Sequence, residues 1–253
     1  MSSLSYFYKI SKKSIFLRKI YLFYNVYVRN FKYHFINNHK NSQFGEESLI
    51  FKHFKKNFKG SFVDIGCFHP TRNNNTYKMY KKGWRGINID LNQLSIDLFK
   101  LARPNDINIC AAVSDKNSKK DLYFISELDT KNTIEKNHTK LLKKNFFINT
   151  SDLQKKKIRT KKLEDILTEH NYFDIDFMNI DIEGHELKVL KTIDFNKFKI
   201  KVICVEIINH NKTSQSNNKK IFNLLKNKGY ILKDKVSVNH IFKKIRQINE
   251  KKN

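Results

Sequence analysis

The stretch "FVDIGCFHP", residues 62–70, combines the end of a predicted strand with the start of an unusual loop. Two apolar residues of strand type lead to Asp64, one more apolar residue and Gly66. Cofactor sites of doubly wound α/β sheets often begin in this way, but they continue into a glycine-rich loop. Here the letters CFHP follow instead of further glycines. The stretch is therefore either a cofactor site with an unusual loop or a buried strand that ends at a turn.

Strand and helix patterns alternate on both sides of this stretch. Such alternation predicts an α/β domain, with a mostly parallel sheet and helices on both faces. The basic run at 155–162 predicts at most a short edge strand, and the last two strands predict a hairpin at the sheet edge. We expect strands at 61–65, up to 90, 107–113, 121–125, up to 181, up to 206, 230–234 and 239–245. We expect helices at 46–54, 77–82, 93–102, 163–170, from 184 and at 219–228.

The composition bounds the class of protein. A chain of 253 residues suits one large domain, or one domain with an appendage. The net charge of +26 suggests nucleic acid or an anionic membrane as a partner, but abundant Lys and Asn with few Gly also indicate a codon bias. Three scattered cysteines argue against a disulfide framework or a zinc site. With no membrane span or signal peptide in the pattern, we expect a cytoplasmic protein.

Residues 1–41 form a separate basic arm rich in aromatic residues. No acidic residue precedes Glu46, while lysines, arginines and aromatic residues alternate. One interpretation is a helix in a membrane interface, which makes residues 1–40 a peripheral contact with an anionic membrane. The other is a helix that packs on the domain and keeps its lysines in water. The coincidence of charge and aromatics favours the interface.

Four carboxylates fall at the ends of predicted strands: Asp64, Asp90, Asp181 and Glu206. Ligands of open α/β sheets bind outside the carboxyl ends of the strands, and an acidic residue some 20–25 positions after the first loop accepts hydrogen bonds from ribose hydroxyls. Acids at these positions repel phosphates, and a pyrophosphate needs several glycines. A cofactor with an amino group, a positive sulfonium and ribose hydroxyls fits better. S-adenosylmethionine meets this description.

Seven motifs in order carry a family resemblance. The most specific is "IDIEGHE" (180–186), which is close to I-D-V-E-G-x-E. They resemble the FkbM-type family of S-adenosylmethionine-dependent methyltransferases over about residues 42–243, so we expect a methyltransferase domain at 42–253. The resemblance implies a Rossmann-like class I fold with seven strands, the last antiparallel, and O-methylation of a hydroxyl of a sugar, a glycan or a related small molecule. The motifs are "SQFGEESLI", "FVDIGCFHP", "NNTYKMYKKGWRGINID", "AAVSDK", "LEDIL", "FMNIDIEGHELKVLK" and "VICVEI".

The resemblance also implies roles for single residues. Asp64 and Gly66 match the cofactor loop at the methionine portion, Asp90 matches the acid at the ribose, and Ala112 matches the neighbourhood of the adenine. The signature after the fourth strand is matched by Asp181, Glu183, Gly184 and Glu186. Many members have a second glycine near position 68 or 69, and this chain departs from that pattern with Phe68, His69 and Pro70.

Methyl transfer to a hydroxyl needs a group that accepts the proton, and such a base contributes about 10²–10⁴-fold in rate. Asp181 and His185 are the preferred candidates, and the others are Glu183, His69 and His210. As alternatives, Asp181 binds the ammonium of the cofactor, His69 only shapes the loop, and Glu183 and Glu186 serve the helix N-terminus. We expect no metal, although clustered acids also suit Mg²⁺.

Three other functions remain open at this point. The basic arm is compatible with a nucleic-acid methyltransferase or binding protein, but no nucleic-acid-binding module is visible and we do not expect nucleic acid as a partner. A dinucleotide-dependent oxidoreductase is disfavoured by the missing glycines. A non-catalytic scaffold would retain the fold without binding the cofactor. No motif in 121–160 identifies the acceptor.

Overall fold

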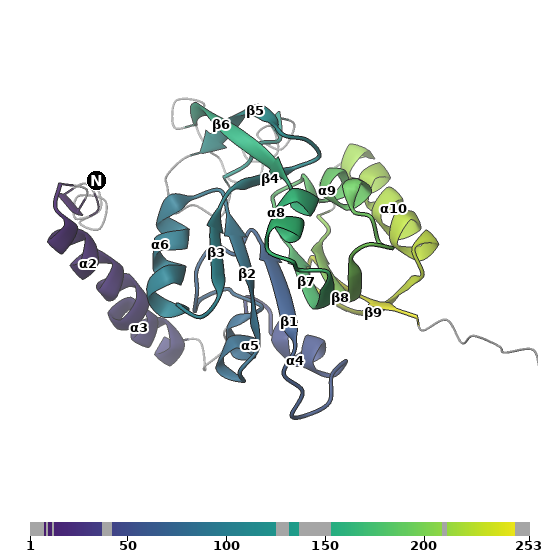
Figure 1. The fold of residues 1–253 in the computed structure, drawn as a ribbon, viewed down its shortest axis with the longest axis horizontal. Helices are drawn as coiled ribbons and strands as arrows, with labels where there is room; N and C mark the ends of the chain where they lie inside the picture. The colour runs from purple at the N-terminus through teal and green to yellow at the C-terminus, as the bar shows by residue number, and fades with distance from the viewer. Residues whose placement is uncertain are drawn as a thin grey trace, which may run out of the picture.

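The computed structural model describes residues 8, 10–11, 13–36, 42–124, 132–136, 153–208 and 212–245. Its main element is a seven-stranded sheet with the strand order β3-β2-β1-β7-β8-β10-β9 (Figure 1). The first five strands of this order pair in parallel, and β10 pairs antiparallel with both of its neighbours. The predicted Rossmann-like fold with a reversed last strand is therefore confirmed. The strands are β1 (Ser61–Ile65), β2 (Arg85–Asp90), β3 (Ile107–Cys110), β7 (Asp174–Ile180), β8 (Lys199–Glu206), β9 (Tyr230–Val236) and β10 (Asn239–Lys244).

Helices cover both faces of the sheet because its central strands are apolar on both sides. On one face, Val63 and Ile65 of β1 share a core with α8 (Leu163–Glu169), α9 (Glu186–Thr192) and α10 (Lys212–Asn227). On the opposite face, Phe62 packs with Ile50 and Met79. Ile50 belongs to α4 (Glu46–Phe51) and Met79 to α5 (Tyr77–Lys81). The helix α6 (Gln93–Ala102) lies beside β2 and β3.

A second sheet of three strands, in the order β4-β6-β5, lies at the top of Figure 1. It contains β4 (Ala112–Ser114), β5 (Ser118–Phe124) and β6 (Gln154–Lys162). Two sequence predictions are wrong here. The expected strand 107–113 breaks after Cys110, because only β3 pairs with β2 and the chain then turns away to pair with β6 as β4. The segment expected to hold at most a short edge strand forms β6, the nine-residue central strand of this sheet. Asp121 on the neighbouring strand β5 offsets part of its positive charge, because Lys155 and Lys157 pair with this carboxylate at 3.0 and 2.7 Å.

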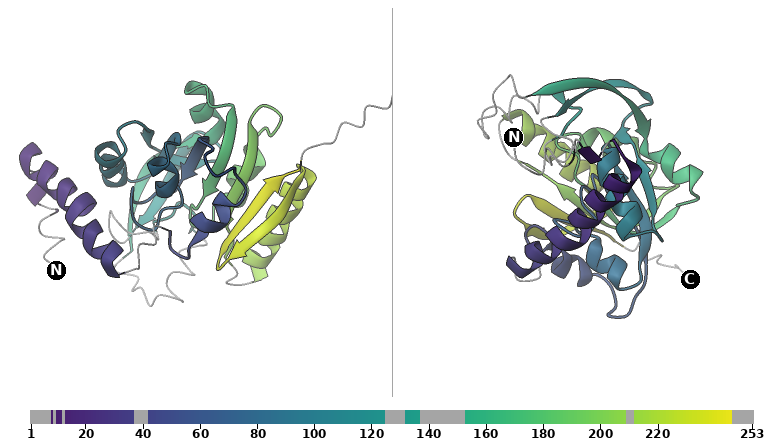
Figure 2. Two further views of the ribbon diagram at one scale, coloured as in Figure 1. Left: turned by 90° about the horizontal axis from the view of Figure 1, so that it is seen from below. Right: turned by 90° about the vertical axis from the view of Figure 1, so that its left-hand side faces the viewer.

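The N-terminal arm is a rod made of α2 (Ile15–Phe23), a π-helix η1 (Tyr24–Val28) and α3 (Arg29–Ile36) (Figure 2). One face of the rod packs on α6: Tyr21, Asn25 and Val26 are buried, and Arg18 Nη2 donates to Asp97 Oδ2 at 2.7 Å. The arm is therefore attached to the domain along one side. Within the described residues, no helix is both long and apolar enough to cross a bilayer.

A buried arginine holds the loop that follows β1. Arg103, which is fully buried, donates from Nε and Nη2 to the Pro70 carbonyl, and its Nη2 also donates to Asn74 Oδ1. Its Nη1 donates to Thr76 Oγ1 at 2.9 Å, and that hydroxyl donates in turn to Asp64 Oδ2 at 2.8 Å. Burial lowers the pKa of Arg103 to about 10, and the charge of Asp64 opposes this effect. One guanidinium thus donates hydrogen bonds to several acceptors of a loop that has little regular structure of its own.

Replacing this arginine tests the role of the network. Arg103→Met leaves the Pro70 carbonyl and the Asn74 amide oxygen without a donor and Asp64 without a nearby cation, so we expect a loss of about 3–5 kcal/mol in the free energy of unfolding. Urea titration followed by circular dichroism measures it. The exposed Lys100 of the same region is the control, and Lys100→Met should change stability by at most about 0.5 kcal/mol. Equal effects of the two changes would contradict the proposed role.

Candidate functional site

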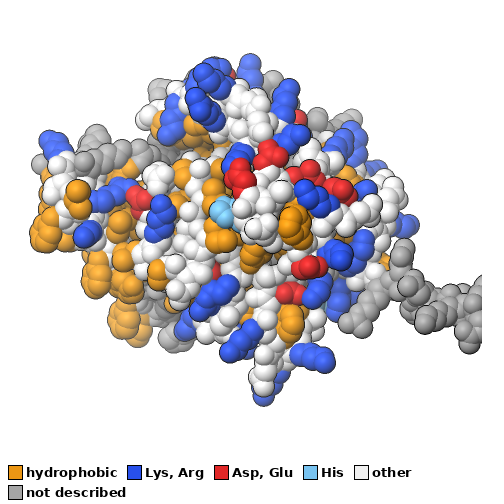
Figure 3. All heavy atoms as spheres, in the orientation of Figure 1, with side chains coloured by type: hydrophobic (Ala, Val, Ile, Leu, Met, Phe, Trp, Pro, Cys, Tyr) orange, Lys and Arg blue, Asp and Glu red, His pale blue; other side chains and the backbone are white. Residues whose placement is uncertain are grey.

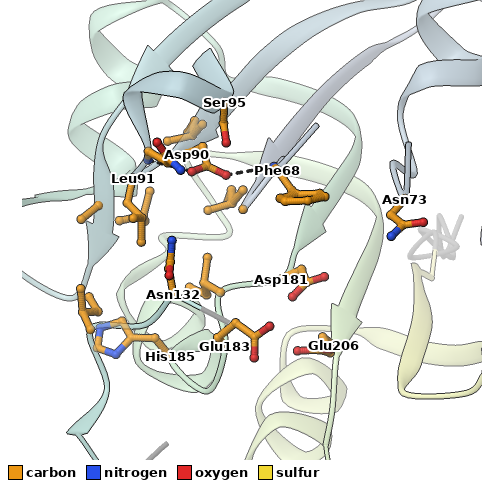
Figure 4. A pocket seen from close by; sticks show the side chains of 18 of the residues that line it. Phe68, Asn73, Asp90, Leu91, Ser95, Asn132, Asp181, Glu183, His185 and Glu206 are labelled. Carbon is orange, nitrogen blue, oxygen red and sulfur yellow. Dashed lines mark hydrogen bonds between the residues drawn. The ribbon is translucent and has the colours of Figure 1, made fainter. Parts of the chain in front are cut away.

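A pocket of 410 Å³ lies at the carboxyl ends of β1, β2, β7 and β8 (Figure 4). Five of the residues chosen from the sequence line it: Gly66, Asp90, Ala112, Asp181 and His185. Glu183 and Glu206 line it as well. Asp64 and His69 do not line the pocket, and His210 lies outside the described residues. The sheet therefore brings together most of the predicted site from distant parts of the chain.

Gly66 allows the two central strands to meet at the pocket floor. Its φ is +80°, and a Cβ at this position would lie 1.7 Å from the carbonyl oxygen of Asp181. Its backbone N–H donates to the Ile89 carbonyl at 2.9 Å, while the Asp181 N–H donates to the Ile65 carbonyl at 3.0 Å. No other residue type fits here without moving the backbone. The loop after β1, the end of β2 and the "IDIEGHE" segment are thus in direct contact.

The loop without a second glycine is held by Asp90. Phe68 adopts a left-handed conformation with φ +52°, a region that glycine enters at no steric cost. Its N–H donates to Asp90 Oδ2 at 2.9 Å, and the N–H of Asn92 donates to Asp90 Oδ1 at 2.8 Å. Each carboxylate oxygen retains a lone pair for a ligand. Burial raises the pKa of Asp90 to about 6.

Asp64 lies beneath the loop rather than at the pocket surface. Its side chain is 1% exposed. It accepts hydrogen bonds from Thr76 Oγ1 at 2.8 Å, Asn179 Nδ2 at 2.9 Å and Asn74 Nδ2 at 3.2 Å. Burial raises its pKa despite these donors. The side chain supports the pocket from below, and a contact of Asp64 with the cofactor stays a prediction.

His69 also belongs to the architecture of the loop. It is fully buried, and its Nδ1 accepts from the backbone N–H groups of Thr71 and Arg72, both at 3.3 Å. Burial, followed by the charges of Arg72 and Arg29, holds its pKa well below the usual value. The ring has no access to the pocket.

Three carboxylates gather on one side of the pocket (Figure 4). One oxygen each of Asp181, Glu183 and Glu206 lies within 4.8 Å of the other two. Burial, and then the charges of Glu183 and Glu186, raise the pKa of Asp181 well above its usual value. Burial and the charge of Asp181 raise the pKa of Glu206 in the same way. Like charges this close favour a cationic ligand, either an ammonium or sulfonium group or a divalent metal ion.

Glu186 shapes the turn that carries this cluster. Its Oε1 accepts from the N–H groups of Ile182 at 3.1 Å and Gly184 at 3.0 Å. Glu183, between them, has a left-handed φ of +54°. Burial raises the pKa of Glu186 to about 7. The two glutamates of the signature therefore differ: Glu186 holds the backbone, and Glu183 faces the pocket.

His185 is enclosed in a polar network on the other side of the pocket (Figure 4). Its Nε2 lies 2.9 Å from Ser114 Oγ, and its Nδ1 lies 3.2 Å from Glu135 Oε2. Lys120 donates to Ser114 Oγ at 2.6 Å, so this buried serine is not a free nucleophile. Hydrogen bonds to His185 and Lys188 lower the pKa of Glu135 to about 2. Both ring nitrogens of His185 are thus engaged with protein groups, although its role as a base stays a prediction.

Several pocket residues have no signal in the sequence. Asn132 and Ile134, together with Glu135 behind them, come from the stretch around 121–160 in which we find no motif. One wall of the pocket is apolar and is formed by Ile89, Leu91, Ala111, Ala112 and Val113. Only Ala112 of this wall is predicted from the sequence. The others become visible once the ends of β2 and β4 are placed side by side.

The family model described as "Methyltransferase FkbM domain" matches residues 64–232, which is more than half of the chain. The match begins at Asp64 and contains each residue predicted to bind the cofactor. No curated protein matches the chain.

The acidic cluster generates a prediction about stability. The unfolded chain loses the proton of Glu206 above about pH 4.3, whereas the folded protein retains it to a higher pH. The folded state therefore binds more protons over this range, and stability falls as the pH rises. We expect Glu206→Gln to remove part of this fall, so that it raises the melting temperature more at pH 8 than at pH 5. Each kcal/mol gained in the free energy of unfolding corresponds to about 2–4 °C for a protein of this size.

Scanning calorimetry of the ligand-free protein at the two pH values measures this effect. The control is Glu169→Gln, which changes a carboxylate that is 55% exposed and paired with Lys161 on the surface. Surface pairs contribute little, so this change should leave the pH profile as it is. A Glu206→Gln protein with the wild-type profile would show that this carboxylate is not strained.

Proposed function

The chain belongs to the FkbM methyltransferase family, and on that premise we propose that it transfers a methyl group from S-adenosylmethionine to a hydroxyl group of a sugar, a glycan or a related small molecule. The observation that carries the choice of donor is the cluster of Asp181, Glu183 and Glu206 in the pocket beside Gly66. A cofactor with phosphates would be repelled by these acids, whereas a donor with an ammonium and a sulfonium would be attracted.

The other pocket residues fit the same donor. Asp90 retains a lone pair on each oxygen for ribose hydroxyls, at the position where acids serve this purpose in doubly wound sheets. The apolar wall that contains Ile89 and Ala112 suits an adenine ring. The volume of 410 Å³ lies in the range of small-molecule sites. These features support S-adenosylmethionine as the cofactor.

The protein's part in the reaction is to position the acceptor and to accept its proton. The bound donor supplies an electrophilic methyl group. The raised pKa of Asp181 lies closer to the working pH than the pKa of an exposed aspartate does, which suits this carboxylate to accept a proton. The network of Glu135, His185 and Ser114 fixes the segment 132–136 against the pocket, so Asn132 is held in place to bind an acceptor. Positioning alone contributes several kcal/mol to such a displacement.

A substitution at Asp181 tests this assignment. Asp181→Asn retains the size of the side chain but removes the charge and the ability to accept a proton, so we expect methyl transfer to fall by about 10²–10⁴-fold. The assay follows labelled methyl groups from the donor into glycans isolated from cells that lack the protein. Asp174→Asn, at the exposed opposite end of β7, is the control and should retain full activity. If donor binding and turnover both survive in Asp181→Asn, the assignment is wrong.

The raised pKa values predict how donor binding depends on pH. A cation binds to the ionised cluster, so affinity should rise between pH 5.5 and pH 8 and binding should release protons. Calorimetry in two buffers with different ionisation enthalpies measures both quantities. Binding that does not depend on pH would contradict the assignment of the cluster to the donor.

Chelation separates the donor from a metal ion. We expect EDTA to leave turnover unchanged, because the three carboxylates are assigned to the donor. Loss of activity that Mg²⁺ restores would assign them to a divalent ion instead. No affinity for S-adenosylmethionine or its demethylated product would overturn the proposed function as a whole.

A further inference from the structure

The outer face of the N-terminal arm exposes a row of large apolar side chains. We name this row the aromatic stripe; Figure 3 shows hydrophobic side chains gathered along this side of the molecule. Phe16, Phe31 and Phe35 are 70%, 75% and 78% exposed. Large exposed apolar patches on a folded protein mark interaction sites. The stripe consists of Phe16, Ile20, Phe23, Tyr27, Phe31 and Phe35.

The stripe is held outward by the opposite face of the same helix. Tyr21, Asn25 and Val26 are buried against the domain, and Arg18 pairs with Asp97 of α6. Because these contacts occupy the inner face, the stripe does not turn inward without breaking them. The arm thus presents a preformed apolar surface.

The charge around the stripe indicates its partner. Lys13 and Lys19 are exposed beside it, Arg29 is half-buried, and no acidic residue precedes Glu46 in the chain. An amphipathic helix with aromatic residues on one face and basic residues along its sides lies in the interface of a membrane. We propose that the aromatic stripe inserts into the interfacial layer of a membrane that contains anionic lipids. The rod of 15–36 covers about 33 Å of that surface.

A second copy of the chain is a poorer occupant. An arm paired with itself would bring together two basic segments that have no acidic residue to balance them. The whole chain also carries a net charge of +26, which repels another copy and attracts an anionic surface. Each basic residue near such a surface adds to the attraction. Charge therefore favours the lipid surface.

Attachment through the stripe would orient the pocket. The arm packs on α6, and Asn92 and Ser95 at the start of α6 line the pocket. A protein bound through the arm therefore holds the pocket at a fixed height above the lipid, where a lipid-linked acceptor would be within reach. The docking itself does not depend on methyl transfer, so it is tested separately.

The test uses the full chain and vesicles at about 0.15 M salt. We expect the wild-type protein to sediment with vesicles of phosphatidylglycerol and phosphatidylcholine at least tenfold more strongly than with phosphatidylcholine alone. The triple change Phe16→Ser, Phe31→Ser and Phe35→Ser should reduce this binding at least tenfold. Charge reversal by Lys13→Glu and Lys19→Glu should also reduce it, and most strongly at low salt.

A matched control removes the same number of exposed apolar side chains elsewhere. The changes Ile231→Ser, Leu232→Ser and Ile245→Ser lie in or beside β9 and β10 and should leave vesicle binding unchanged. Equal binding by the wild type and the stripe variant, or no binding by either, would overturn the proposal. A wild-type dimer that becomes a monomer in the stripe variant, without vesicle binding, would identify a second copy as the occupant. RNA binding that the stripe variant loses, again without vesicle binding, would identify nucleic acid.

Discussion

The pocket depends on a buried polar contact chain that runs from Arg103 through Thr76 to Asp64. A glycine-rich loop builds a cofactor site from its own backbone, since its N–H groups approach the ligand directly. This chain lacks such glycines after position 66, and its loop takes its shape from Arg103, which follows α6, and from Asp90 at the end of β2. The guanidinium of Arg103 has five N–H donors in one plane, where an ammonium has three, and it reaches the Pro70 carbonyl, Asn74 and Thr76 together. The shape of the site is thus encoded outside the loop.

The same region contains a cluster of acidic side chains at the pocket. Asp181, Glu183 and Glu206 lie close together in a partly buried place, and burial together with neighbouring carboxylates raises the pKa of Asp181 and of Glu206. Natural proteins retain such strain at sites where a ligand relieves it. Two acids at neighbouring strand ends therefore differ in their surroundings. Hydrogen-bond donors surround Asp64, which supports the loop, whereas other carboxyl groups surround Asp181.

The sequence predicts the strands of the main sheet well because each is a short apolar run that ends in an acid or a turn. It also predicts which strand ends meet, since parallel strands share one carboxyl edge. The prediction fails at 107–113, where some of the side chains are small, and at 154–162, where most of them are basic. In both segments the strand that completes the pairing is distant in the sequence. The prediction misses the burial of Asp64 because the donors that enclose this side chain, on Asn74, Thr76 and Asn179, come from segments that are distant in the sequence. Asn132 has no local pattern and depends on tertiary contacts alone.

The π-helical segment η1 sets the geometry of the arm. Phe23, Tyr27, Phe31 and Phe35 are four residues apart, and in an α-helix a step of four overshoots one turn by about 40°. Repeated steps would wind these rings around the rod. Hydrogen bonds of the i to i+5 type contain more residues in each turn, so the step across η1 falls short of a turn and offsets the drift. One irregular turn thereby offsets part of the drift and keeps the rings nearer to one side of the rod, the side that is free to meet a surface.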